Sequence, residues 1–381
     1  MKRYTVQILV LYISTVFIIS NIYVAQPILP ILTKDFNISD QMASLAVSIT
    51  ILFLSFTLLI YGPLSDFFGR KLIMIVSGFL LAIPTFLTIF AKNFTYFLIM
   101  RALQGCFVSG MAAIAMAYIS EEFPWQLLGR AIGIYILGMI TSGLTGRVLG
   151  GLISGIFGWK SMFLFFSILN ILGSLLMLIY LPSSKNFIKN LSIKESFIGM
   201  LNHFKNKILI GAFIIGFCLF FTFTCVFTYV SFYLTDEPFN LNTIQLSMIY
   251  FVYIAGLISP LAGSYSNKIG RKPVILFGLI TALSGIIITL ISITPFVILA
   301  LFFLCAGLFI TQPATSAMVG ENAKTAKGSA TSLYLFFYYL GGSFGAFLPG
   351  YFWSLYGWSG IFFISIFMIF IAMFSLLILC K

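Results

Sequence analysis

The chain has 381 residues, of which 61% are hydrophobic and 8% are charged. Soluble domains carry about 25% charged and roughly 45–50% apolar residues, so the composition excludes a water-soluble fold and indicates lipid as the main solvent. The formal net charge is +12, but the charges lie in short loops between apolar runs, which argues against a nucleic-acid partner.

Twelve apolar runs are long enough to cross a bilayer, which takes about 20 mainly apolar residues. Lipid offers the backbone no hydrogen-bond partner, so each run must be a helix. The first run follows Met1-Lys2-Arg3 without a small-residue cleavage site, which predicts an uncleaved first span. The predicted spans are 6–32, 42–64, 72–91, 94–119, 129–157, 160–182, 207–234, 243–265, 273–293, 295–318, 328–353 and 358–380.

Lysine and arginine are distributed unevenly between the two sides of the predicted membrane. The side that holds the N-terminus carries sixteen of them, and the opposite side carries only Lys34, Lys92 and Lys160. Positive charge favours the cytoplasmic side, so both termini are predicted to be cytoplasmic. The longest polar stretch divides the chain into an N-terminal six-helix bundle (1–182), a cytoplasmic linker (183–206) and a C-terminal six-helix bundle (207–381).

An internal repeat supports this division into halves. The loop after the second span, at 62–71, and the loop after the eighth, at 263–272, match with an offset of 201 residues. Gly158-Trp159 returns as Gly357-Trp358 with an offset of 199. Such matches predict two similar halves of the same orientation, related by an axis along the membrane normal, which is one transporter building plan.

The motif residues carry a family resemblance. The loop Gly62-Pro-Leu-Ser-Asp66-Phe-Phe-Gly69-Arg70-Lys71 resembles the loop signature of the major facilitator superfamily, and 263–272 resembles its weaker second copy. Arg101-Ala-Leu-Gln104-Gly105 is similar to the arginine motif of the family's fourth helix. The run 146–151 resembles its antiporter motif, with Arg147 in place of proline. Gln26-Pro27-Ile-Leu-Pro30 resembles a bacterial inner-membrane subgroup near the drug/proton antiporter branch.

This resemblance implies an all-α membrane protein, with twelve transmembrane helices in two parallel pseudo-symmetric six-helix bundles. It implies a multi-pass transporter of the cell inner membrane, which works as a monomer and is not an enzyme. It also implies that the loop motif forms a cytoplasmic latch between the bundles, with Asp66 paired to Arg70 or Arg130; Asn267 replaces the acid in the second copy. The alternative is a solvated turn whose aspartate caps a helix. The latch residues are Gly62, Asp66, Gly69, Arg70, Lys71, Arg130, Gly270 and Arg271.

Two arginines, Arg101 and Arg147, lie well inside predicted spans. A charge near the bilayer centre costs at least ~2.5–3.5 kcal/mol, so each is expected to face a cavity or to be paired. All nine acidic residues fall at span ends or in loops. Two interpretations remain: the arginines attract an anionic or zwitterionic solute, or they are structural and bind helix carbonyls.

The family resemblance places spans 1, 4, 7 and 10 around a central cavity. Aromatic and apolar walls with few polar groups suit a small amphipathic solute. Thr228, Tyr229 and Thr311 are further polar groups on these spans. The candidate substrate-binding or coupling residues are Gln26, Arg101, Gln104, Arg147, Asn21, Tyr23 and Gln312.

The leading functional hypothesis is proton-linked efflux of a small amphipathic compound or metabolite by alternating access. The alternative is a facilitator or exchanger of an anionic metabolite that uses Arg101 and Arg147. No nucleotide-binding loop is present, so no ATP-driven step within the chain is expected. No cofactor or metal site is indicated, because the five cysteines lie in apolar runs without ligand spacing and the single His203 is expected to be an exposed loop residue.

Overall fold

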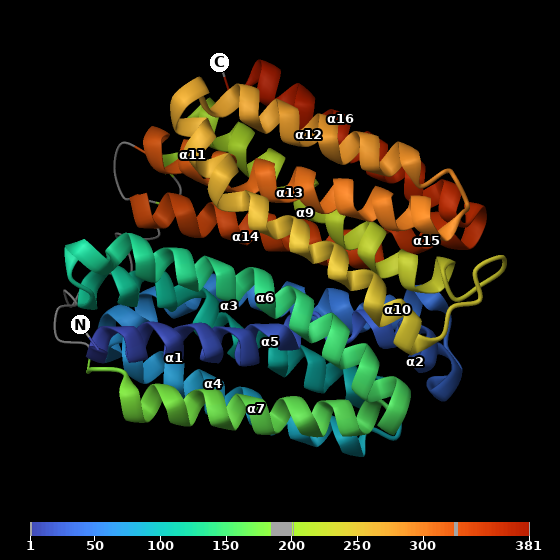
Figure 1. Ribbon diagram of the computed structural model, residues 1–381, viewed down its shortest axis with the longest axis horizontal. Helices are drawn as coiled ribbons and strands as arrows, with labels where there is room; N and C mark the ends of the chain where they lie inside the picture. The colour runs from blue at the N-terminus through green and yellow to red at the C-terminus, as the bar shows by residue number, and fades with distance from the viewer. Residues whose placement is uncertain (1, 184–199, 201, 324–326, 381) are drawn as a thin grey trace. The chain divides into compact units, whose positions relative to one another are not determined.

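The computed structural model describes residues 2–183, 200, 202–323 and 327–380, and within these ranges every regular element is a helix (Figure 1). Eleven helical segments of the described chain are long and apolar enough to cross a membrane. The predicted eleventh span corresponds to α14 (Lys327–Phe347), continued by α15 (Pro349–Tyr356). The prediction of an all-α membrane fold is therefore confirmed.

The chain forms two compact units, and the first comprises residues 1–28 and 49–193. Its first span is broken by short 3-10 turns, whereas its other helices are long and continuous. In this unit α1 packs against α6 and α7, and α4 packs against α5 and α7. The elements of this part of the chain are α1 (Lys2–Ile19), η1 (Ser20–Ile22), η2 (Gln26–Ile28), the larger part of α3 (Asp40–Phe68), α4 (Arg70–Leu87), η3 (Thr88–Phe90), α5 (Phe94–Glu122), α6 (Trp125–Phe157) and α7 (Trp159–Tyr180).

The second unit comprises residues 29–48 and 194–381, so it includes the end of the first span and the start of the second. Most of the predicted linker 183–206 lies outside the described residues. The central helix is α9, against which α14 and α16 pack. The elements are α2 (Leu29–Phe36), the first turns of α3, α9 (Lys207–Tyr233), α10 (Thr243–Ile249), η4 (Tyr250–Ile258), α11 (Ser259–Ile269), α12 (Arg271–Ile288), α13 (Thr294–Asn322), α14, α15 and α16 (Trp358–Ile378).

Glycines of the repeated motifs separate consecutive helices in both units. Gly69 and Gly270 have φ of 93° and 95°, and Gly158 and Gly357 have φ of 84° and 55°. Residues with a Cβ rarely adopt such angles, so a glycine ends one helix and lets the next begin in a new direction. These four are the positive-φ glycines of the described chain. The repeat found in the sequence therefore marks equivalent turns of the backbone.

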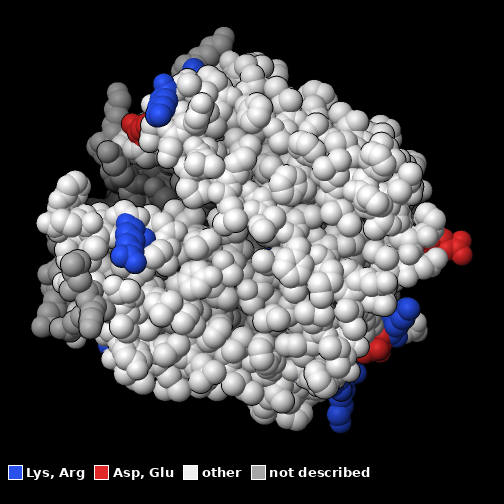
Figure 2. Space-filling view, in the orientation of Figure 1, with Lys and Arg blue, Asp and Glu red and all other residues white. Residues whose placement is uncertain are grey.

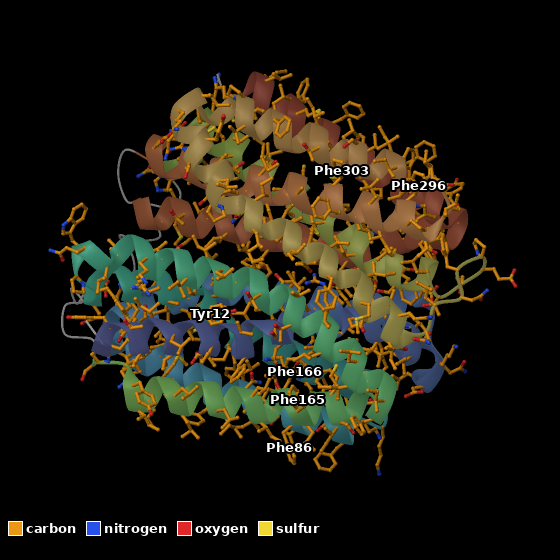
Figure 3. All side chains as sticks on the ribbon, in the orientation of Figure 1. Tyr12, Phe86, Phe165, Phe166, Phe296 and Phe303 are labelled. Carbon is orange, nitrogen blue, oxygen red and sulfur yellow. The ribbon has the colours of Figure 1, made fainter. Side chains whose placement is uncertain are left out.

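The surfaces of the helices are largely apolar. Figure 2 shows a face on which uncharged side chains cover the helices and the visible charges lie near their ends. Phe86 and Phe296 point outward in Figure 3 and are 41% and 43% exposed, whereas Phe166 is fully buried. The phenylalanines thus divide between lipid-facing positions and helix packing.

The expectation that His203 is an exposed loop residue is wrong, because its side chain is only 5% exposed. Contacts of the residues that follow His203 in the sequence explain this burial. The Phe204 ring contacts the rings of Phe213 and Phe337, and the Asn206 amide donates a hydrogen bond to the Asn322 carbonyl at 3.1 Å. The five cysteines are free thiols, and no metal-binding cluster exists among the described residues.

Replacing Gly158 by alanine is expected to destabilise the protein by roughly 1–3 kcal/mol, because its backbone region is almost exclusive to glycine. No atom lies within 4 Å of the added Cβ, so the loss would come from the backbone alone. Thermal unfolding of the purified protein in detergent measures it. Gly133→Ala is the matched control, since Gly133 is helical, exposed and equally free of neighbours; equal melting temperatures for the two variants would contradict this explanation.

Candidate functional site

The first span is interrupted between Ile19 and Leu29. Pro27 lacks a backbone N–H, so it cannot continue the regular hydrogen-bond ladder of the helix. The Gln26 N–H donates to the Tyr23 carbonyl at 3.1 Å, rather than to the Ile22 carbonyl as an α-helix requires. The break therefore leaves backbone carbonyls that need other donors in a buried setting.

Arg101 supplies two of these donors. Its Nη1 donates to the Asn21 carbonyl at 2.9 Å, and its Nη2 lies 3.3 Å from the Ile22 carbonyl. The side chain is fully buried. A planar guanidinium holds several donors in a fixed geometry, which suits two successive carbonyls. The contacts match the structural interpretation of Arg101, in which the guanidinium binds helix carbonyls.

Gln104 connects Arg101 to the end of α4. Its Oε1 accepts a hydrogen bond from Arg101 Nη1 at 2.5 Å, and its Nε2 donates to Thr88 Oγ1 at 2.9 Å. Both predicted residues lie one turn apart on α5, so they face the same neighbours. The result is a polar connection across three helical segments within one unit.

Asn21 is the third residue held in this buried group. Its Nδ2 donates to Asn170 Oδ1 at 2.8 Å and to the Ile18 carbonyl at 3.0 Å. Thr85 Oγ1 lies 3.4 Å from both asparagine side chains. Asn170 and Thr85 were not among the residues predicted from the sequence; a lone asparagine in an apolar span was the available signal. These bonds satisfy polar groups that burial would otherwise penalise.

Arg147 lies against the other end of the break. Its Nε donates to Gln26 Oε1 at 2.5 Å, and its Nη1 donates to the Gly143 carbonyl of its own helix at 2.8 Å. Its guanidinium lies over the Tyr23 ring, 4.1 Å from the centroid. Arg147 and Gln26 are fully buried, whereas Tyr23 is partly exposed. Cation–π and amide contacts thus bring three predicted residues together.

Glycines of α6 allow this close approach. A Cβ on Gly146 would lie 2.5 Å from the Ser20 carbonyl oxygen, and one on Gly150 would lie 3.1 Å from the Val24 carbonyl oxygen. Small residues bring helix backbones together in lipid, where apolar burial gives little driving force. The motif around Arg147 therefore serves both packing and the placement of the arginine.

Candidate residues of the second half do not form a comparable cluster. Gln312 is half-buried on α13 and forms no hydrogen bond with the described residues. Thr311 donates to the Gly307 carbonyl of its own helix at 2.8 Å. The Tyr229 hydroxyl lies 3.3 Å from Ser44 Oγ at the start of α3. Gln312, Thr311 and Tyr229 therefore share no hydrogen-bond partner among the described residues.

The loop motif places Arg70 between two carboxylates. Its Nη1 lies 2.5 Å from Asp66 Oδ1, and its Nη2 lies 2.9 Å from Glu121 Oε1 at the end of α5. Nη1 also donates to Ser65 Oγ at 2.5 Å. Asp66 is therefore paired within its own unit. Arg130 is exposed and joins no ion pair in the described part of the chain.

Arg271 repeats this arrangement in the second unit without the first acid. Its Nη2 lies 2.6 Å from Glu321 Oε1, and its Nη1 donates to Ser266 Oγ at 2.5 Å. Asn267 is exposed and makes no hydrogen bond with the described residues. Glu121 and Glu321 were not predicted as partners of these arginines, although their spacing of 200 residues differs by only one from the 201-residue offset of the loop motif.

Two further motif residues have structural explanations. Lys71 donates to the carbonyls of Leu178 and Leu181 at 3.0 and 2.6 Å, which satisfies the end of α7 as a basic residue at a helix C-terminus can. Gly62 lies inside α3, and a Cβ there would meet no atom within 4 Å. The expected turn is therefore made by Gly69, not Gly62.

Comparison with known proteins shows the family to which this chain belongs. The sequence pattern of the Major Facilitator Superfamily matches residues 11–256 and 236–381. The chain belongs to the Major Facilitator Superfamily. Members of this superfamily are multi-pass membrane transporters of small solutes, so the prediction of a transporter rather than an enzyme is confirmed.

Several relatives of this chain are named as transport proteins of bacteria. The chain is 40% identical to the inner membrane transport protein YnfM of Escherichia coli, over 89% of this chain and 82% of the relative. It is 34% identical to an uncharacterised transporter of Buchnera aphidicola from Schizaphis graminum, over 100% and 92%. It is 27% identical to a PmrA homologue of Lactococcus lactis, named a multi-drug resistance efflux pump, over 68% and 65%.

Solved structures of other transporters share the fold. A bacterial homologue of the lysosomal transporter Spinster aligns with a TM-score of 0.81 at 14% identity, over 98% of this chain and 96% of that one. A D-xylose–proton symporter aligns with a TM-score of 0.78 at 17% identity, over 98% and 97%. At these identities the likeness concerns the fold alone.

Arg101→Ala is expected to lower the free energy of unfolding by about 3–5 kcal/mol, the range for breaking a buried charged contact. Carbonyls of the broken span would lose their donors. Arg101→Lys keeps the charge but has no planar pair of donors, so it should recover little of the loss. Thermal unfolding in detergent tests both, with Arg130→Ala as the exposed control; a wild-type melting temperature for Arg101→Ala would refute the role.

The two loop arginines are expected to differ in their contribution to stability. Arg70→Ala should cost roughly 1–3 kcal/mol, because charged hydrogen bonds to partly buried acids are lost. Arg271→Ala should cost about 1 kcal/mol or less, since its partner Glu321 is 55% exposed. Unfolding at low and high salt measures both: the smaller effect should vanish with salt, and a larger effect at Arg271 would contradict the prediction.

Proposed function

We propose that this protein exports a small amphipathic compound or metabolite in exchange for protons, by alternating access of its two halves. The observation that carries this proposal is the broken first span, where the partly exposed Tyr23 ring lies beside Arg147 and Gln26. Discontinuous spans form solute sites near the bilayer midplane in many transporters. An aromatic face with adjacent polar groups suits a solute that is part apolar and part polar.

Relatives support the direction of transport. Three proteins that are 26–27% identical to the chain are named multi-drug resistance efflux pumps. The sequence has no nucleotide-binding loop, so an ion or solute gradient must supply the energy. We take protons as the coupled ion, because the sequence motifs resemble those of the drug/proton antiporter branch. We take a monomer as the working form, because one chain carries both halves of the repeat.

The residues of the break would then have two kinds of role. Tyr23 would contact the solute, and the buried Gln26 and Arg147 would hold the Tyr23 ring in place from below. Asn21, Arg101 and Gln104 would hold the irregular backbone in place, because they form hydrogen bonds with backbone carbonyls and side-chain amides of their own unit. Gln312 remains a candidate solute contact from the second half.

We place the protein in the inner membrane with both termini in the cytoplasm, on the basis of its lysines and arginines. In this orientation the loops at Arg70 and Arg271 are cytoplasmic. They would act as latches that stabilise one conformation of the transporter, together with Asp66, Gly69 and Gly270. The exposed Arg130 is then a further candidate partner of the latch.

The second candidate function is exchange of an anionic metabolite. The position of Arg147 favours it, because a guanidinium lies directly beneath the partly exposed Tyr23 ring. A negatively charged solute next to this ring would interact with that charge in a setting of low dielectric constant. In this alternative Arg101 would contribute to the attraction, and no proton movement would accompany transport.

The distinguishing experiment uses proteoliposomes that contain a pH-sensitive dye. Ethidium, chloramphenicol and benzenesulfonate serve as cationic, neutral and anionic probes. Proton movement driven by ethidium or chloramphenicol is expected, and Tyr23→Ala should reduce it about fivefold, because an aromatic contact is worth roughly 1 kcal/mol. Tyr23→Phe should retain it, since the ring remains.

Tyr356→Ala is the matched control, because this tyrosine is 65% exposed on α15. Counterflow of benzenesulfonate without proton movement, lost in Arg147→Gln, would replace the proposed function by the exchanger. Absence of proton movement with all three probes would overturn proton-linked export of this solute class.

A further inference from the structure

The first turns of α3 present three polar residues on one face. Asp40, Ser44 and Ser48 follow each other at intervals of four residues, which places them in a row along the helix. Each forms a hydrogen bond to a helix of the second unit, to which residues 29–48 also belong. We call these three residues and their partners the polar zipper.

The outermost contact joins Asp40 to Trp353. Trp353 Nε1 donates to Asp40 Oδ2 at 2.9 Å, and the indole ring lies 5.8 Å from the Tyr229 ring. The Tyr229 hydroxyl lies 3.3 Å from Ser44 Oγ, one turn further along α3. Residues of α15 and α9 thus contact successive turns of the same helix face.

The innermost contact is reciprocal. Ser48 Oγ and Ser343 Oγ lie 3.0 Å apart, and each hydroxyl lies within 3.0 Å of the other residue's carbonyl oxygen. The two serines are 6% and 1% exposed. Mutual hydrogen bonds between small side chains can form and break without repacking an apolar core, which distinguishes the zipper from ordinary helix packing.

The continuity of α3 gives the zipper its significance. From Ile49 onward the helix belongs to the first unit, where Thr50 donates to the Arg101 carbonyl at 3.1 Å. Residues 40–61 contain neither glycine nor proline, the usual causes of a sharp kink. Movement of one unit against the other therefore has to bend a regular helix or release the zipper.

The first span faces no such conflict. Its irregular stretch, residues 20–28, ends where the chain passes from the first unit to the second, at Ile28 and Leu29. This stretch can absorb a change of direction in the backbone. For α3 the side-chain contacts are the part that can yield.

Asp40 gives the zipper a group that can take up a proton. No ion pair of Asp40 is found among the described residues. The charge of Asp236, from the segment after α9, acts on Asp40, and the charge of Asp40 in turn acts on the neutral Tyr229; α15 contributes the neutral Trp353. A hydrogen bond to an ionised carboxylate is stronger than one to a neutral group, so a proton on Asp40 would weaken its contact with Trp353.

We propose that Asp40 is a positioning residue of the polar zipper that releases Trp353 when it binds a proton, and so makes the opening of the zipper depend on pH. The opening follows from alternating access, which the superfamily shares, whereas the proton dependence rests on the proposed function. The two parts require separate measurements.

The first measurement follows the zipper without any solute. Spin labels are attached to Met42→Cys and Tyr356→Cys, which replace exposed residues of α3 and α15, in a background with the half-exposed Cys106 changed to serine. Pulsed electron–electron double resonance in lipid nanodiscs is expected to give two populations of distances between the two labels. The longer one should grow at least about twofold between pH 7.5 and 5.5.

Asp40→Asn should enlarge the longer population and remove its pH response, whereas Asp35→Asn, an exposed acid on the preceding helix, should leave the response intact. One unchanged narrow distance in all variants at both pH values would overturn the proposal. Two populations without a pH response would remove the role of Asp40 while leaving a moving zipper.

The second measurement locks the zipper. Oxidation of Ser48→Cys/Ser343→Cys should form a disulfide, because the two Oγ atoms lie 3.0 Å apart. The oxidised protein is expected to lose at least about tenfold in ethidium transport, with recovery on reduction. Each single-cysteine variant, oxidised in the same way, is the control.

Full transport by the cross-linked protein would refute an opening zipper. If ethidium is not transported at all, the distances between the spin labels in the oxidised and the reduced double variant, labelled as above, decide the question. Loss of the longer-distance population on oxidation would support the opening of the zipper, while the proposed solute class would be wrong.

Discussion

The contact between a buried guanidinium and two open carbonyls is the constraint on which the first unit depends. The break in the first span requires donors that lipid cannot provide, and Arg101 provides them. The arginine equally requires the break, because a regular helix would offer it no free carbonyl at that depth. Neither feature is stable alone in a buried site, so the irregular backbone and the charge must occur together.

Other polar residues depend on this same break. Gln26 meets Arg147 because the backbone turns through residues 23–26 instead of continuing as a helix. Gly146 lets α6 approach that turn, since a side chain there would collide with the Ser20 carbonyl. A solute site built at such a place combines a preformed backbone with side chains whose orientation is already fixed. The geometry therefore favours a binding role for Tyr23 more than for the deeply enclosed Arg101.

The helices and the helix-ending glycines were predictable because they depend on local chemistry. Apolar length predicts a span at 207–234, where the structure has α9 at Lys207–Tyr233, and the repeated loop motif locates Gly69 and Gly270. Partners across helices were not predictable, since Glu121 meets Arg70 only after α4 and α5 pack together. The burial of His203 has the same cause: neighbouring side chains dock on α9 and α14. Residues placed by family resemblance alone, such as Gln312, did not converge with other candidates.

The two units differ in where their irregular backbone lies. In the first unit it is concentrated in residues 20–28 and tied down by arginine, whereas in the second it is the nine-residue 3-10 stretch η4, much longer than the usual three or four residues. Arg271 also has one acidic partner where Arg70 has two. A repeated fold with unequal contacts has no reason to move symmetrically. The second unit, whose loop arginine has a single acidic partner, is then the one in which the side-chain contacts of its own residues 40–48 can change while α3 remains a regular helix.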